Sequence, residues 1–160
     1  MRKIINPWQN KNEGPNKCFG CSKQNPNGLQ MEFFEDGEHI VSEWTPRPEF
    51  EGYIDMLHGG IQATILDEVA CWVVYIKCKT SGVTSNMDIK YRGAVNLNGQ
   101  PIKARASLIE TTSRMVTIKA EILNNEDKVC SEAVIKYFIF PEKLAQEKYH
   151  YPGVEAFFEE

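Results

Sequence analysis

The apolar positions of this chain follow two different periods, which divide it into one long helix and several strands. Residues 61–76 are apolar at all but four positions, so the pattern predicts a helix from about Gly59 to about Lys79 that is buried on most sides. At 1.5 Å per residue this helix would be about 30 Å long. The polar exceptions within it are Gln62, Thr64, Asp67 and Glu68.

Strand-like alternation of apolar and polar residues occurs on both sides of this helix. Residues 29–34 and 39–45 flank an acidic Gly-containing turn and predict a hairpin. Alternation with short turns predicts an antiparallel sheet with one face in water. The runs that follow the helix are 83–91, 102–108, 116–122 and 129–139.

The run at 83–91 alternates at every second residue and predicts two faces. The apolar face is expected to hold Val83, Met87, Ile89 and Tyr91. The polar face is expected to hold Thr84, Asn86, Asp88 and Lys90.

The order of these elements predicts an α+β fold with a single core. An antiparallel β-sheet of about six strands would wrap around one long central α-helix, because a curled sheet can cover a helix that is apolar nearly all round. We expect this domain over residues 29–140. Residues 1–28 are rich in Asn, Pro, Gly and Lys and predict an irregular N-terminal leader. Residues 141–160 are expected to form a C-terminal tail packed on or near the domain.

Charge and cysteine usage exclude several classes of function. The net charge of −4 and the scattered basic residues provide no electrostatic footprint for nucleic acid. The first residues contain no apolar stretch typical of a signal peptide, and the five cysteines are expected to be reduced thiols, so we expect a cytoplasmic protein. The helix at 61–76 is expected to be too short and too acidic to span a membrane.

Two acids in the helix lack a local cation. Neither Asp67 nor Glu68 has a basic residue three or four positions away, so a salt bridge within the helix does not explain either of them. An acid in an apolar helix is costly to bury and is a candidate site residue. Asp67 is a candidate catalytic carboxylate or a structural acid bound to a backbone group. Glu68 is a weaker candidate that could instead contact a dimer partner or face a pore.

The residues that open the helix favour binding of negative charge. His58, Gly59 and Gly60 precede the apolar run, and the backbone N–H groups at a helix N-terminus attract anions. Two adjacent glycines allow a ligand to approach the backbone closely. A plain glycine helix start and a histidine that braces the loop are the structural alternatives. Asp67 lies nine residues after His58.

With these motifs, the chain resembles the hotdog-fold acyl-CoA thioesterases, in particular their PaaI-type (phenylacetate-pathway) branch. The resemblance covers about residues 18–140. In that branch a His-Gly-Gly opens the central helix and an Asp follows nine residues after the His. The segments that carry the resemblance are His58-Gly59-Gly60, 63–68 with Asp67, 87–92, and the leader elements 18–21 and 25–29.

The resemblance implies hydrolysis of acyl-CoA to a free acid and CoA. Asp67 would attack the thioester or act as general base on water. The Gly59 N–H would stabilise the oxyanion, and His58 would orient the loop or donate to the substrate. Thr84 would lie beside the attacking water, although an ordinary strand threonine is as plausible. Gly60, Glu68, Arg92 and Arg114 are the candidate substrate-binding residues, and the two arginines would meet CoA phosphates unless they are solvated surface residues.

The resemblance also bears on assembly and on rival functions. Hotdog sites are similar to clefts shared across a dimer, so we expect a homodimer or a dimer of dimers and no cofactor. Many relatives carry Asn or Gln before the His, whereas Gly52 and the acid Asp55 occupy that region here. This difference keeps open the alternative of a non-catalytic acyl-CoA-binding or regulatory protein. A hotdog hydratase or dehydratase is a further alternative, although the chain does not match the helix signature of those relatives.

Cys18 and Cys21 form a single CxxC pair in the leader. A structural zinc site needs four ligands, and the sequence has no second CxxC or histidine pair. We therefore expect no bound metal and interpret this segment as a leader with two thiols.

Overall fold

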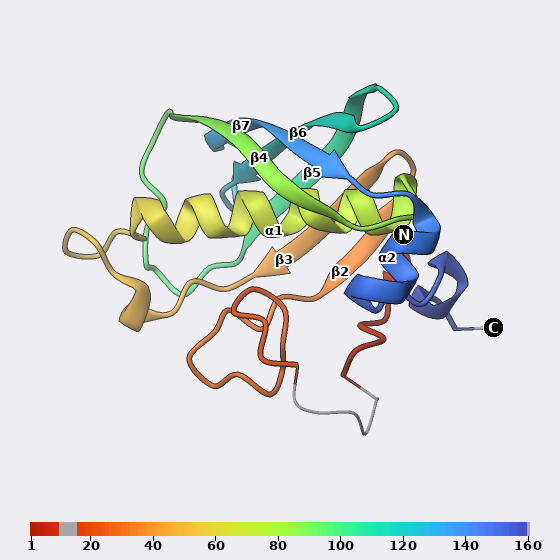
Figure 1. The fold of residues 1–160 in the computed structure, drawn as a ribbon. Helices are drawn as coiled ribbons and strands as arrows, with labels where there is room; N and C mark the ends of the chain where they lie inside the picture. Colours follow the sequence, from red (N-terminus) through yellow and green to blue (C-terminus); the bar gives the residue numbers. More distant parts are fainter. Residues whose placement is uncertain (10–15, 160) are drawn as a thin grey trace.

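The computed structural model describes residues 1–9 and 16–159. Its strands form one antiparallel sheet of seven strands in the order β1-β2-β3-β5-β6-β7-β4, which curls around the long helix α1 (Figure 1). The strands are β1 Arg2–Ile4, β2 Phe33–Asp36, β3 His39–Trp44, β4 Gly82–Tyr91, β5 Ile102–Thr111, β6 Met115–Leu123 and β7 Val129–Ile139. The helices are η1 Pro48–Phe50, α1 Gly59–Lys77, α2 Glu142–Tyr149 and η2 Val154–Phe157.

Helix α1 begins where the sequence predicts and ends two residues earlier. The Nδ1 atom of His58 accepts a hydrogen bond from the Gly60 N–H at 2.9 Å and so caps the first turn. The last helical residue is Lys77 rather than Lys79, because Lys79 adopts a left-handed conformation with φ of 54°. The core around α1 therefore extends over nearly the whole predicted span.

Small side chains line the part of the sheet that faces the helix. Ala106 on β5 pairs with Ala120 on β6, and Ala120 pairs with Ala133 on β7. All three are buried. A row of alanines across three strands lets a curved sheet approach a helix closely without overpacking.

The sheet has seven strands rather than about six, because the leader contributes β1. Arg2–Ile4 pairs with β2, and only Ile4 of its three residues is buried, so the apolar pattern of this strand is too short to detect. The strand expected at 29–34 is also displaced to Phe33–Asp36. Leu29 and Met31 are buried, but their N–H groups donate to the carbonyls of Phe19 and Gly20 in the leader instead of joining the sheet.

The alternation predicted for β4 is wrong at its start because the strand contains a bulge. The pairing with β7 shifts between Thr84 and Asn86. Thr84 therefore pairs with buried Tyr137, and Met87 pairs with buried Ile135, so the two are in phase. Thr84 thus lies on the helix side of the strand, where its hydroxyl reaches Asp67, although the residue stays exposed. Bulges commonly redirect a side chain in this way beside functional sites.

The C-terminal tail packs across the end of α1. The N–H of Ile5 donates to the Phe157 carbonyl at 2.8 Å, so the two ends of the chain lie together (Figure 1). The Trp8 ring contacts Trp72 and Phe157 edge-on at centroid distances of 6.3 and 5.4 Å. An aromatic cluster therefore joins the leader, α1 and the tail.

The expectation that this helix is too short and too acidic for a membrane is wrong on both counts. By length and composition alone, α1 is able to span a membrane. Half of its most apolar window (50%) is buried inside the structure, however, and a core helix has the same composition. Its position inside the curled sheet accounts for its apolar character.

Candidate functional site

The Asp67 carboxylate lies at the junction of α1, β4 and β7. The Thr84 hydroxyl donates to Asp67 Oδ1 at 2.8 Å, and the Tyr137 hydroxyl donates to the same oxygen at 2.5 Å. The Tyr137 hydroxyl is also 2.7 Å from the Asp67 backbone carbonyl oxygen. The second carboxylate oxygen, Oδ2, has no hydrogen-bond or ion-pair partner among residues 1–9 and 16–159. One oxygen is thus held in place while the other is available to a ligand or water.

Tyr137 is the functional candidate that sequence reasoning missed. Its side chain is 1% exposed, and burial, together with the neighbouring Cys71 and Asp67 groups, raises its pKa far above the usual tyrosine range. The hydroxyl therefore remains protonated and serves as a permanent donor to Asp67. The sequence did contain a signal, because a hydroxyl stands at position 137 on an otherwise apolar strand face.

His58 and Gly59 line an open groove of about 840 Å³, a size typical of small-molecule sites, whereas Gly60 is not part of its lining. The N–H of Gly60 is used in the cap to His58, whereas the N–H of Gly59 has no acceptor within the described parts of the chain. The Tyr91 hydroxyl donates to the Gly59 carbonyl at 2.8 Å and joins the end of β4 to the start of α1. Gly59 therefore presents a free donor to the groove.

Gln62 is a second residue that the sequence did not single out for function. It lines the same groove and is 4% exposed. Its Nε2 donates to the Leu57 carbonyl at 3.3 Å, but its Oε1 is buried without a partner in the described structure. An unsatisfied buried carbonyl oxygen is costly and suits a site that receives a donor from a ligand.

The two candidate arginines lie far apart in one chain. Arg92 lines the groove and forms an ion pair with Glu132 at 2.7 Å. Arg114 follows β5, and its carbonyl accepts from Ile139 at the opposite end of β7. Of these two arginines, only Arg92 therefore lies near the Gly59 groove of the same chain.

The loop that contains Gly52 and Asp55 is tightly packed against the start of α1. The N–H of Gly52 donates to the Met56 carbonyl at 2.9 Å, and a Cβ on Gly52 would lie 3.1 Å from the Cα of His58. Asp55 adopts a left-handed conformation with φ of 60°, and its N–H donates to a Glu51 carboxylate oxygen. This loop favours a small residue at position 52 because it lies directly against the helix start.

Glu68 turns away from Asp67 and contacts the leader. Its Oε1 is 3.6 Å from the Cys18 sulfur and accepts from the Trp72 indole N–H at 3.1 Å. Burial raises the pKa of Glu68 to about 7. A hydrogen bond from the Cys21 thiol, aided by backbone N–H groups, lowers the pKa of Cys18 to about 6. The structure does not place Glu68 with the other candidate substrate-binding residues.

Asp67 and Gly59 occupy separate parts of the same helix. Eight residues of helix separate them, a distance of about 12 Å along the axis. The structure groups Asp67 with Thr84 and Tyr137, and it groups His58 and Gly59 with Arg92 around the groove. Gly60 is next to this groove in sequence but does not line it.

Comparisons with known proteins address the fold. A family model described as the thioesterase superfamily matches residues 55–131. No curated protein sequence matches the chain at a significant level. A hypothetical thioesterase from Streptococcus pneumoniae TIGR4, solved with coenzyme A, is 20% identical with a TM-score of 0.65 and aligns over 70% of this chain and 90% of its own.

Two further solved structures are similar. Zebrafish thioesterase superfamily member 2 is 18% identical, with a TM-score of 0.64, over 72% of this chain and 89% of its own. A Streptococcus mutans UA159 protein bound to acetyl-CoA is 15% identical, with a TM-score of 0.65, over 70% of this chain and 90% of its own. An antiparallel sheet wrapped around one central helix, shared with these structures, gives this chain the hotdog fold.

Proposed function

We propose that this protein is a thioesterase that hydrolyses acyl-CoA to a free acid and CoA, of the PaaI type. One observation carries the proposal: Asp67 has one oxygen fixed by Thr84 and Tyr137 and a second oxygen without a partner in the described structure. A carboxylate held in this way is suited to accept a proton from water or to attack a carbonyl carbon. The match of residues 55–131 to the thioesterase superfamily supports the same class of reaction.

The chemistry requires a base and an oxyanion donor at one carbonyl. Asp67 takes a proton from water as the water oxygen attacks the thioester carbon, or its own oxygen attacks and the acyl-enzyme is then hydrolysed. The free Gly59 N–H at the start of α1 stabilises the oxyanion. The carbon–sulfur bond then breaks, and CoA leaves with a proton on its sulfur. One water molecule is consumed in either route.

The separation of the two groups favours a site shared between subunits. About 12 Å of helix lies between Asp67 and Gly59, too far for both to contact one carbonyl in a single chain. Strand β4 is at the edge of the sheet, and Tyr53 and Ile54 beside the groove are each 83% exposed. A homodimer in which Asp67 of one subunit faces Gly59 of the other would complete the site, alone or within a dimer of dimers.

This arrangement predicts recovery of activity when two inactive variants are mixed. Asp67→Asn and Gly59→Pro would each disable both sites of a homodimer. After co-refolding, half of the dimers are mixed, and each mixed dimer has one intact site, so about one quarter of the wild-type activity should return. Light scattering at micromolar concentration should give a dimer or tetramer. A monomer with full activity, or a mixture no more active than its components, would contradict the shared site.

Release of free thiol from a panel of acyl-CoA substrates tests the activity itself. A thiol reagent should report continuous release that depends on the protein concentration. Tight binding of acyl-CoA with no release would support the alternative of a non-catalytic binding protein. Conversion of an enoyl or 3-hydroxyacyl chain with the thioester left intact would support a hydratase or dehydratase.

A further inference from the structure

Three metal-ligating side chains meet on the face of α1 that lies under the leader. The sulfur atoms of Cys18 and Cys21 and a carboxylate oxygen of Glu68 all lie within 4.8 Å of one another. The pair between Cys18 and Glu68 is already at 3.6 Å. At the usual zinc–sulfur and zinc–oxygen lengths, the ligand atoms of a tetrahedral zinc are roughly 3.5–3.8 Å apart. Side-chain movements of about 1 Å or less would therefore bring the donors to metal-binding distances.

The leader loop has a defined shape that presents these sulfurs to the helix. The N–H of Ser22 donates to the Cys18 carbonyl at 3.1 Å and closes the CxxC turn. Leu29 and Met31 secure the loop from the other side through the Phe19 and Gly20 carbonyls, at 2.7 and 2.9 Å. The CxxC pair is thus positioned by backbone hydrogen bonds rather than by chance contact.

Gly20, between Cys18 and Cys21, lies directly against the Glu68 carboxylate. A Cβ at this position would lie 2.5 Å from the Glu68 carboxylate carbon, closer than atoms can approach. Only glycine lets the loop and the acid come together without a shift. This close fit makes the contact between the leader and Glu68 a specific feature of the chain.

The described residues supply no cation to this cluster. Glu68 has the Trp72 indole N–H as a donor but forms no ion pair within residues 1–9 and 16–159. Lys23, the next basic residue after the pair, is bound to the Gln30 carbonyl at 2.9 Å and to Glu32 at 3.2 Å. A carboxylate and two thiols therefore share a partly buried space without a positive partner, which a divalent cation would supply.

We propose that Cys18, Cys21 and Glu68 bind a thiophilic divalent cation, with Zn²⁺ as the expected ion. Two thiolates and a carboxylate are ligands that zinc accepts, and three protein ligands leave one tetrahedral position for water. The expectation of a metal-free pair rested on the lack of a second ligand pair, and the third donor comes instead from Glu68, 47 positions beyond Cys21.

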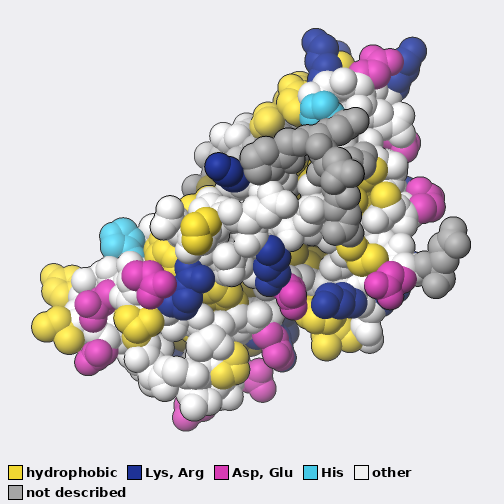
Figure 2. All heavy atoms as spheres, turned by 90° about the horizontal axis from the view of Figure 1, so that it is seen from below, with side chains coloured by type: hydrophobic (Ala, Val, Ile, Leu, Met, Phe, Trp, Pro, Cys, Tyr) yellow, Lys and Arg dark blue, Asp and Glu magenta, His cyan; other side chains and the backbone are white. Residues whose placement is uncertain are grey.

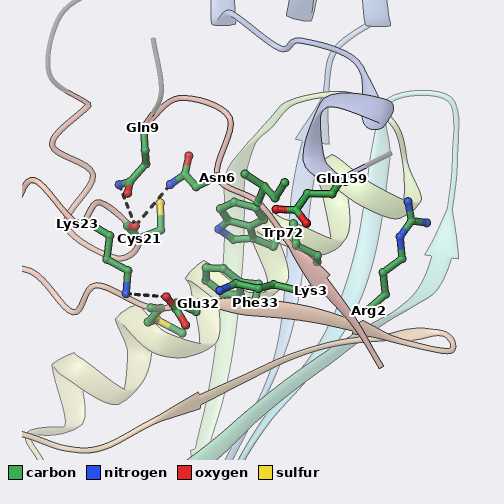
Figure 3. A pocket seen from close by; sticks show the side chains of 13 residues that line it. Arg2, Lys3, Asn6, Gln9, Cys21, Lys23, Glu32, Phe33, Trp72 and Glu159 are labelled. Atoms are coloured by element: carbon green, nitrogen blue, oxygen red, sulfur yellow. Dashed lines mark hydrogen bonds and ion pairs between the residues drawn. The ribbon is translucent and has the colours of Figure 1, made fainter. Parts of the chain in front are cut away.

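A cavity lies beside one of the three proposed ligands, Cys21. The cavity has a volume of about 440 Å³, and Figure 3 shows Cys21 at its edge with Asn6 and Gln9 reaching toward the Cys21 carbonyl. Trp72 and Phe33, stacked at 4.4 Å, form the apolar wall of this cavity. The remaining lining comes from β1 and from Ile5, Lys23, Met31, Glu32 and Glu159. This cavity is separate from the groove at Gly59 and shares no lining residue with it.

The bound ion would join the leader to α1 one residue away from Asp67. A metal that binds only the folded arrangement stabilises it by mass action. The site would hold the leader over the helix without contacting the thioester. The inference is therefore independent of the proposed hydrolysis.

Metal analysis of the purified protein tests this site. After passage over a chelating resin, the wild-type protein should retain about one zinc per chain. Once that zinc has been removed, Zn²⁺ added to the metal-free protein should raise its unfolding temperature. Co²⁺ in place of zinc should give a sulfur-to-metal charge-transfer absorption. Cys18→Ser should weaken that absorption, and Cys18→Ser/Cys21→Ser should abolish it. Substitution of residues that only support the ligands lowers metal affinity by roughly 10–100-fold. Glu68→Gln removes a ligand itself, so it should weaken zinc binding by at least this factor.

Cys78→Ser is the matched control, because Cys78 is a half-buried thiol outside the cluster, and it should leave zinc binding unchanged. Glu68→Gln keeps the side-chain volume, so it stays informative if Cys18→Ser fails to fold. Three results would overturn the site: folded wild-type protein that binds Zn²⁺ no more tightly than Cys18→Ser/Cys21→Ser, unchanged zinc affinity in Glu68→Gln, or a metal-free protein with Cys18 and Cys21 joined in a disulfide.

Discussion

Replacement of Asp67 by asparagine should lower the turnover of an acyl-CoA substrate by a factor on the order of 10² or more while the protein stays folded. Thr84 and Tyr137 both donate to Oδ1, and the asparagine side chain retains a carbonyl oxygen that can accept from both. The change therefore removes the negative charge and the second carboxylate oxygen but keeps the hydrogen bonds that hold the side chain. The free energy of unfolding should change by less than about 1 kcal/mol.

Steady-state kinetics and chemical denaturation measure the two effects separately. Asp88→Asn is a matched control, because it makes the same chemical change at an exposed acid on β4, and its turnover should equal that of wild type. Near-normal thioester hydrolysis by folded Asp67→Asn protein would remove this carboxylate from the mechanism. Loss of activity accompanied by unfolding would instead assign Asp67 a structural role.

Helices and strands were predictable from the sequence where the local pattern of apolar and polar residues alone determined which residues are buried. In β5 and β6 every second residue is buried over much of the strand, and in α1 the apolar run alone predicted the span to within two residues. These elements lie against a single core, so burial follows the local period. Strand β1 has only three residues and one buried side chain, and a pattern of that length does not rise above chance.

The bulge in β4 changed the side that Thr84 faces. Strict alternation places Thr84 with Asn86 and Asp88 in water, yet the register shift turns it toward Asp67. Only the resemblance to thioesterases pointed to Thr84 from the sequence. An extra residue in one strand leaves no mark on composition, so the local pattern could not predict the phase change.

The candidate site was predicted in part, because its remaining contacts join distant positions. Tyr137 lies 70 residues after Asp67, and Cys18 lies 50 residues before Glu68. The sequence identified both acids as unpaired but gave no information on what each one faces. One residue of helix corresponds to a rotation of about 100°, so neighbours in sequence reach different surroundings.

Asp67 and Glu68 accordingly lie on different faces of α1. Asp67 lies under β4 and β7 with two hydroxyl donors, whereas Glu68 lies under the leader with two sulfurs. The outer surface seen in Figure 2 carries basic and acidic side chains intermingled, and no single sign of charge dominates it.

Gly59→Pro should lower turnover by roughly 10²–10³, the range found when one oxyanion donor is removed. Gly59 is the first residue of α1, the helix position at which proline is most readily accepted. The preceding residue, His58, already has φ of −58° and ψ of 134°, which a following proline favours. The substitution therefore deletes the free N–H while the helix start keeps its backbone shape.

Gly59→Ala separates the loss of the N–H from the effect of added bulk. A Cβ at this position would lie 3.5 Å from the Tyr91 ring, an ordinary contact, so alanine should fold and keep its N–H. We expect Gly59→Ala to retain most of its turnover and Gly59→Pro to lose it, with KM for acyl-CoA changing much less than kcat in the proline variant. Circular dichroism and light scattering would establish that both variants keep the wild-type fold and assembly. Equal turnover in the two folded variants would show that the Gly59 N–H does not stabilise the oxyanion.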